Sequence, residues 1–74
     1  MDSTSRAILE ALDSERGSPT ALELAQQLDL RLADVEQSLK TLTARRFVIR
    51  MQPIGRHPAR YLLSPRGREA VRGE

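Results

Sequence analysis

Residues 24–42, LAQQLDLRLADVEQSLKTL, decide how this chain folds. Two segments with helical spacing of apolar residues flank Asp29-Leu30, which we interpret as a tight turn. The apolar residues around the first segment share one arc at about 100° per residue: Ala21, Leu24, Ala25 and Leu28. Those of the second project to one side: Leu32, Val35, Leu39 and Leu42. The stretch therefore predicts a helix over 21–28, a tight turn, and a helix over 32–45.

The start of the first of these helices has its own signal. Thr20 followed three residues later by Glu23 has the pattern of a capping box, in which each side chain bonds the other residue's backbone amide. Leu22 falls outside the apolar arc. We expect it to pack on a neighbouring element, and a surface for a partner is the alternative.

The flanking sequence predicts three further elements. A helix over 4–16 has Ser3 or Ser5 as its cap and Gly17 at its C-terminal end. A β-hairpin occupies 47–63, because β-prone segments border a tip that contains Pro53, Gly55 and Pro58. A last short helix spans 65–72, with Ser64 as its cap and a proline at its first position.

The order of elements is helix, helix, helix, strand, strand, helix. We expect a single domain, residues 1–74, that is mainly α with a small β-hairpin, an α+β fold. The chain has no Cys and one His, so neither a disulfide nor a metal site is expected to stabilise this small core.

Charge is divided between the two halves of the chain. Residues 1–37 carry three arginines against eight carboxylates, and residues 38–74 carry nine basic residues against two carboxylates. Eleven of the twelve basic residues are Arg, which makes bidentate contacts with phosphate and guanine. A GC-rich genome that favours Arg codons is an equal explanation of that usage. The basic half nevertheless favours a polyanionic partner.

Other function classes find no support. The sequence has no nucleophile with a nearby base, no Gly-rich phosphate loop and no metal-ligand cluster, so we expect no enzyme and no cofactor. It also has no signal peptide or membrane span, so we expect a soluble cytoplasmic protein without a membrane partner.

Four stretches in order carry a resemblance to a known family: Leu24–Leu30, Val35–Leu42, Phe47–Arg50 and Tyr61–Gly67. Together they resemble the winged helix-turn-helix regulators of prokaryotes, especially the MarR, PadR and ArsR types. The resemblance covers nearly all of the chain. It implies that the third helix enters a DNA major groove and that the hairpin is a wing. We expect no counterpart in these 74 residues of the flanking helices that build the dimer and ligand pocket of MarR proteins.

The resemblance places the site on the third helix and the wing. The candidate DNA-binding residues are Arg31, Ala33, Asp34, Gln37, Lys40, Thr41 and Arg45 on the helix and Arg50, Arg56, His57 and Arg60 on the wing. Gln37 is expected to recognise a base, adenine by preference, and the basic residues to contact phosphate or guanine. Asp34 suits the helix N-terminus, whereas Glu36 beside it would face phosphates unfavourably. An ordinary solvated helix face and a hairpin kept soluble by Arg are the alternatives.

We therefore expect sequence-specific binding of double-stranded DNA in transcriptional regulation. A winged-helix adaptor that binds a protein partner is the alternative, favoured by Asp34, Glu36 and Leu22, and RNA binding is a third. So small a domain contacts few base pairs, so we expect a homodimer or a protein partner.

Overall fold

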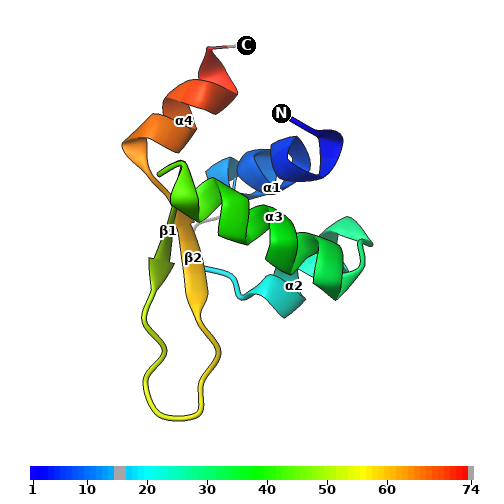
Figure 1. Cartoon of the computed structure of the whole chain (residues 1–74), viewed down its shortest axis with the longest axis vertical. Coiled ribbons are helices and arrows are strands. Elements are labelled where there is room, and N and C mark those ends of the chain that lie inside the picture. Colours follow the sequence, from blue (N-terminus) through cyan, green and yellow to red (C-terminus); the bar gives the residue numbers. More distant parts are fainter. Residues whose placement is uncertain (15–16, 74) are drawn as a thin grey trace.

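The computed structural model describes residues 1–14 and 17–73 and has the expected order of elements (Figure 1). These elements are α1 (Ser3–Ser14), α2 (Ala21–Leu28), α3 (Leu32–Ala44), β1 (Val48–Met51), β2 (Arg60–Leu63) and α4 (Pro65–Arg72). The predicted fold class, four helices with a two-stranded antiparallel hairpin before the last, is confirmed.

The first helix begins differently from the prediction. The Asp2 carboxylate, not Ser3 or Ser5, caps α1: its Oδ1 accepts from the Ser5 amide at 2.7 Å. A carboxylate suits this place because it also compensates the positive end of the helix dipole. The predicted end at Arg16 lies outside the described residues, and Gly17 does not have the left-handed backbone of a C-terminal cap.

The second helix starts with the predicted capping box. Glu23 N donates to Thr20 Oγ1 at 3.2 Å, and Thr20 N donates to Glu23 Oε1 at 2.8 Å. The helix ends at Asp29, which is left-handed with φ 55°, and Leu30 N donates back to Ala25 O at 2.9 Å. This bond pattern reverses the chain in the short space before α3. Leu22 is 52% exposed, so its expected packing against a neighbour is wrong.

The third helix buries most of the predicted apolar face. Val35, Leu39 and Leu42 are buried, whereas Leu32 is 39% exposed at the first turn and does not belong to the core. The helix ends one residue earlier than predicted, because Arg45 is its C-cap and Arg46 is left-handed with φ 65°.

The hairpin is shorter than predicted and has one additional partner. Its four-residue strands pair Val48 with Leu63 at the base and Met51 with Arg60 at the tip side. Tyr61 N donates to Pro19 O at 2.9 Å, and Thr20 forms an isolated antiparallel bridge with Arg60. The chain just before α2 therefore lies along β2 as the start of a third strand.

The last helix packs against α1 and β2, and its first residues contact the segment that joins α3 to β1. The Ser64 hydroxyl accepts from Gly67 N at 3.0 Å, as predicted for its cap, and donates to Arg46 O at 2.6 Å. Phe47 and Tyr61 are half-buried and pack against the core cluster. Arg66 lies 5.4 Å above the centre of the Phe47 ring.

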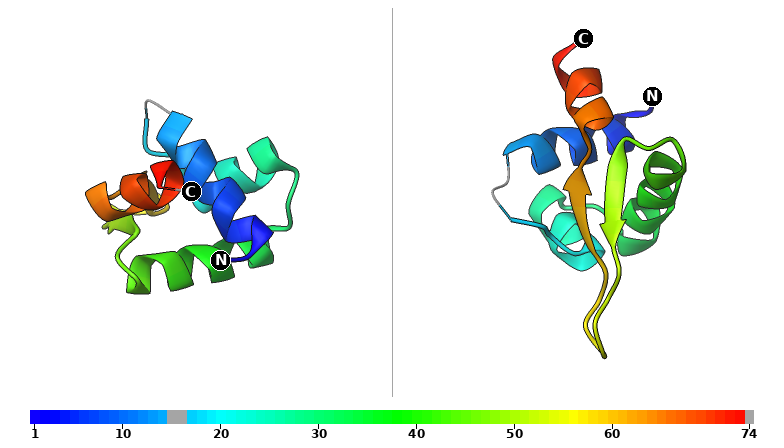
Figure 2. Two further views of the ribbon diagram at one scale, coloured as in Figure 1. Left: turned by 90° about the horizontal axis from the view of Figure 1, so that it is seen from above. Right: turned by 90° about the vertical axis from the view of Figure 1, so that its left-hand side faces the viewer.

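The helices form a compact body from which the hairpin extends (Figure 2). The core draws its buried apolar residues from α1, α2, α3 and both strands: Ile8, Leu9, Ala11, Leu12, Leu24, Ala25, Val35, Leu39, Leu42, Val48 and Leu63. The molecule measures 37 × 23 × 22 Å, and the hairpin tip and α4 lie at opposite ends of its long axis (Figure 1).

Candidate nucleic-acid interface

One side of α3 faces solvent along its whole length. The core holds the opposite side through Val35, Leu39 and Leu42, which fixes the rotation of the helix about its axis. The exposed side carries Ala33, Gln37, Lys40, Thr41 and Ala44. In Figure 1 α3 lies in front of α1, and in the left view of Figure 2, seen from above, it lies along the lower edge of the molecule. This surface is available to a groove or to a partner protein.

The N-terminal end of α3 is mixed in charge. Arg31 is its N-cap residue, but its side chain caps no backbone amide in the described part of the chain. Asp34 lies in the first turn, where a negative charge is favourable, and Glu36 is exposed two residues later. Both carboxylates reduce the attraction of this end of the helix for phosphate.

The C-terminal end of α3 is basic. Arg45 and Arg46 are exposed as the helix ends, and Arg50 is exposed on β1. The Thr41 hydroxyl donates its hydrogen to the Gln37 carbonyl of its own helix at 3.3 Å, and this hydrogen bond is exposed to solvent. Cations and hydroxyls of this kind suit phosphate oxygens.

The wing tip presents two further candidates. Arg56 and His57 are exposed in a turn closed by a bond of 3.2 Å from His57 N to Ile54 O. Gly55 has φ 63° there, a conformation that glycine adopts without strain. The turn holds Arg56 in the hairpin tip, and this tip lies at the opposite end of the molecule from α4 (Figure 1).

Arg60 is placed differently from the other predicted residues. Its Nη1 donates to Ser18 O at 2.9 Å and lies 3.6 Å from Glu23 Oε1, so its side chain faces the start of α2. Hydrogen bonding from the Thr20 backbone, and to a smaller extent Arg60, holds the pKa of Glu23 below its ordinary value.

The predicted residues thus form two exposed groups, and Arg60 belongs to neither of them. The α3 group comprises Arg31, Ala33, Asp34, Gln37, Lys40, Thr41 and Arg45, and the wing group comprises Arg50, Arg56 and His57. The sequence analysis missed the pairing of residues 18–20 with β2. No local pattern could have indicated it, because the partners lie about 40 residues apart in the chain.

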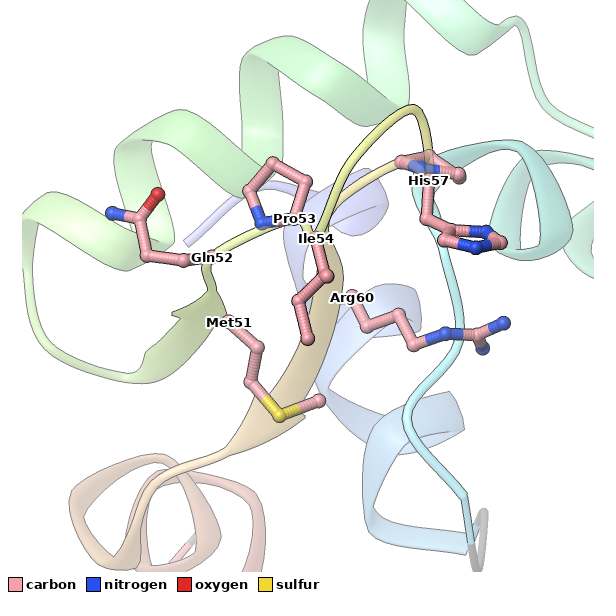
Figure 3. Close-up of a pocket in the computed structure, with 7 residues that line it drawn as sticks. Met51, Gln52, Pro53, Ile54, His57 and Arg60 are labelled. Carbon is pink, nitrogen blue, oxygen red and sulfur yellow. The ribbon is translucent and has the colours of Figure 1, made fainter.

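Among the described residues, no group of three or more His, Cys, Asp or Glu residues is placed to hold a metal ion. No helix in the described ranges is long and apolar enough to cross a membrane. A shallow apolar hollow lies under the wing tip, lined by Met51, Ile54, Pro58 and neighbouring residues (Figure 3).

No protein-family model matches the chain, and a comparison with curated proteins finds no match. Solved structures do match. A MarR family transcription regulator is 27% identical, with a TM-score of 0.84 over 97% of this chain and 48% of its own. BpsR of Bordetella bronchiseptica, whose DNA binding is regulated by 6-hydroxynicotinic acid, is 20% identical, with a TM-score of 0.85 over 99% and 51%.

A third similar structure contains nucleic acid. ZitR of Lactococcus lactis, solved in complex with DNA, is 19% identical, with a TM-score of 0.82 over 97% of this chain and 49% of its own. The chain spans about half the length of these solved structures. Their likeness shows that it has a MarR-like winged-helix fold.

Proposed function

We propose that this chain, which has a MarR-like winged-helix fold, binds double-stranded DNA sequence-specifically as part of transcriptional regulation. The observation that carries the proposal is α3 itself. Its inner side is buried, its outer side is exposed from Ala33 to Ala44, and exposed arginines follow at its end and on the wing. An α-helix fits the major groove, and cations beside it fit the phosphates that border the groove.

The residues of α3 divide between bases and backbone in this proposal. Gln37, central on the exposed side, recognises a base, and adenine suits its amide because both groups offer a donor and an acceptor. Ala33 allows close approach, and Asp34 serves the helix N-terminus. The remaining members of the group contact phosphate or guanine: Arg31, Lys40, Thr41 and Arg45.

The wing neutralises backbone charge. Arg50, Arg56 and His57 contact phosphates or the adjacent minor groove, which contributes affinity without sequence preference. These contacts hold α3 in register on the duplex.

The similar structures support this function without assigning it. One is described as a MarR family transcription regulator, the DNA binding of the second is regulated by 6-hydroxynicotinic acid, and the third was solved with DNA. None of the three is described as an enzyme. We infer a DNA-binding protein without catalytic activity that acts in the cytoplasm of a prokaryotic cell. Because one α3 and one wing contact few base pairs, we propose that it binds DNA as a homodimer or with a protein partner.

One observation favours a second function, binding of a protein partner. Leu22 is 52% exposed on α2, and Asp34 and Glu36 add exposed carboxylates on α3. An exposed apolar residue and exposed carboxylates suit a protein with a basic or mixed surface better than they suit DNA.

Titration of the ¹⁵N-labelled chain with a random DNA duplex at two salt concentrations tests the proposal. We expect amide shifts at Gln37, Thr41 and Arg56 that weaken steeply with salt. No shift even at low salt would exclude DNA and favour the protein partner. Stronger competition by double-stranded RNA than by DNA would favour the RNA alternative.

A further inference from the structure

The root of the wing is tied to the start of α2 by one side chain. Arg60 extends from β2 across to the segment that precedes α2 (Figure 3), where its Nη1 lies 2.9 Å from Ser18 O. The same nitrogen lies 3.6 Å from Glu23 Oε1. Glu23 is itself held by the capping box, since its Oε1 accepts from Thr20 N at 2.8 Å. Arg60 therefore contacts a segment whose own geometry is fixed.

Arg60 stands where the paired part of the hairpin ends. It is the first residue of β2 and pairs with Met51, the last residue of β1, and residues 52–59 beyond them form the tip. The backbone bond from Tyr61 N to Pro19 O, 2.9 Å, ties the next residue of β2 to the same segment. The direction in which the tip leaves the body is thus set at Arg60.

We propose that Arg60 is a positioning residue, which fixes the wing relative to α2 through Ser18 and Glu23 and does not contact phosphate. This inference rests on the proposed DNA binding. A fixed wing lowers the entropic cost of binding, because Arg56 is held in place before the duplex arrives.

The alternative, Arg60 as a phosphate ligand, is electrostatically unfavourable. To reach DNA, the guanidinium would leave Ser18 O and expose the unpaired Glu23 carboxylate to a polyanion. Arg56 has neither obstacle, because it lies at the exposed tip and forms no ion pair with a carboxylate among the described residues. The two arginines therefore form a matched pair for substitution by Gln.

The first measurement uses the free protein. In Arg60→Gln, we expect the ¹⁵N order parameters of residues 54–57 to fall below those of the wild-type chain, toward the value of about 0.6 typical of flexible backbone. Glu23→Gln should lower them in the same direction, because Gln keeps an oxygen for the Thr20 amide but loses the charge that attracts Arg60. Arg56→Gln should leave them unchanged.

The second measurement is the salt dependence of binding to a duplex. Arg60→Gln should weaken binding by less than about fivefold, as expected for a half-exposed ion pair, and leave the log–log slope against salt unchanged. Arg56→Gln should reduce that slope by about 1, because it removes a phosphate contact.

Two results would overturn the positioning role. One is an unchanged order of the wing in Arg60→Gln, and the other is a slope reduced by about 1 in that variant. Failure of the wild-type chain to bind any duplex would overturn the proposed function instead, while the measurement on the free protein still decides whether Arg60 positions the wing.

Discussion

At the scale of single residues, Gly67 is the glycine with the least room for a side chain. A Cβ built there would overlap the Phe47 carbonyl oxygen and lie 2.9 Å from Leu63 Cδ1. The Phe47 carbonyl also accepts from Ser64 N at 3.1 Å, so it is fixed and cannot give way easily. Glycine at this position lets α4 approach the residues that join α3 to the wing.

Gly67→Ala should therefore destabilise the fold by about 1–3 kcal/mol, since the overlap outweighs the gain in helix propensity. Urea unfolding measures the change. The matched control is Gly17→Ala, where a Cβ meets no described atom within 4 Å and φ is not positive. A loss for Gly67→Ala no larger than that of the control would contradict the packing argument.

Gln37 is the residue on which sequence preference should depend. With a preferred duplex from selection, Gln37→Ala should lose about 1–3 kcal/mol of discrimination at one base pair and keep its affinity for random DNA. Competition with single-base-pair variants of the site measures it. Gln26→Ala, exposed on α2, is the control. An unchanged preference at every base pair would show that Gln37 faces no base.

At the scale of elements, two of the helices have a carboxylate that accepts a hydrogen bond from a backbone amide at the helix N-terminus. The Ser5 backbone amide holds the pKa of Asp2 below 3.8, its ordinary value, and the Thr20 amide holds the pKa of Glu23 below 4.5. When folding lowers the pKa of a carboxyl group, the group stabilises the fold at pH values above its ordinary pKa. This stabilisation disappears as the pH falls through the lowered pKa of the folded state.

Stability should thus be flat near neutral pH and decline once the pH falls below about 4.5, the ordinary value for Glu23. Urea midpoints between pH 7 and pH 2 measure this decline. In a variant with both Asp2→Asn and Glu23→Gln the decline should be shallower, because neither position then binds a proton. An equal loss of stability with falling pH in the wild type and the variant would show that other carboxylates cause it.

At the scale of the whole molecule, the long axis separates the wing from α4. The residues proposed to contact phosphate include five permanent cations, which lie on α3 and the wing: Arg31, Lys40, Arg45, Arg50 and Arg56. Arg72 lies at the end of α4, and α4 is at the opposite end of the molecule from the hairpin tip (Figure 1). Charge alone does not distinguish Arg72 from the other five, because all six residues are cations. Only their placement predicts which of them a duplex would meet.

Five cationic phosphate contacts predict a log–log slope of about −4 to −5 for binding of random duplex against salt. Fluorescence anisotropy over a series of salt concentrations gives the slope, and Arg72→Gln should leave it unchanged. A slope near zero would contradict the proposed surface, and a loss of slope in Arg72→Gln would move that surface toward α4.

Much of this architecture was predictable from the sequence because its causes are local. Helical periodicity placed α2 and α3 and indicated that Gln37 and Lys40 are exposed while Val35 is buried. The Thr20 capping box and the Ser64 cap depend on residues three positions apart, so both were identified correctly.

The rest depends on which surfaces meet, and only the tertiary structure decided it. Leu22 and Leu32 have the chemistry of core residues but no element covers them fully. The fit of Gly67 against Phe47 joins residues distant in sequence. The sequence does not distinguish Arg60 from the other basic residues of the wing. Its contacts with Ser18 and Glu23 join segments some 40 residues apart, and such contacts leave no local pattern in the sequence.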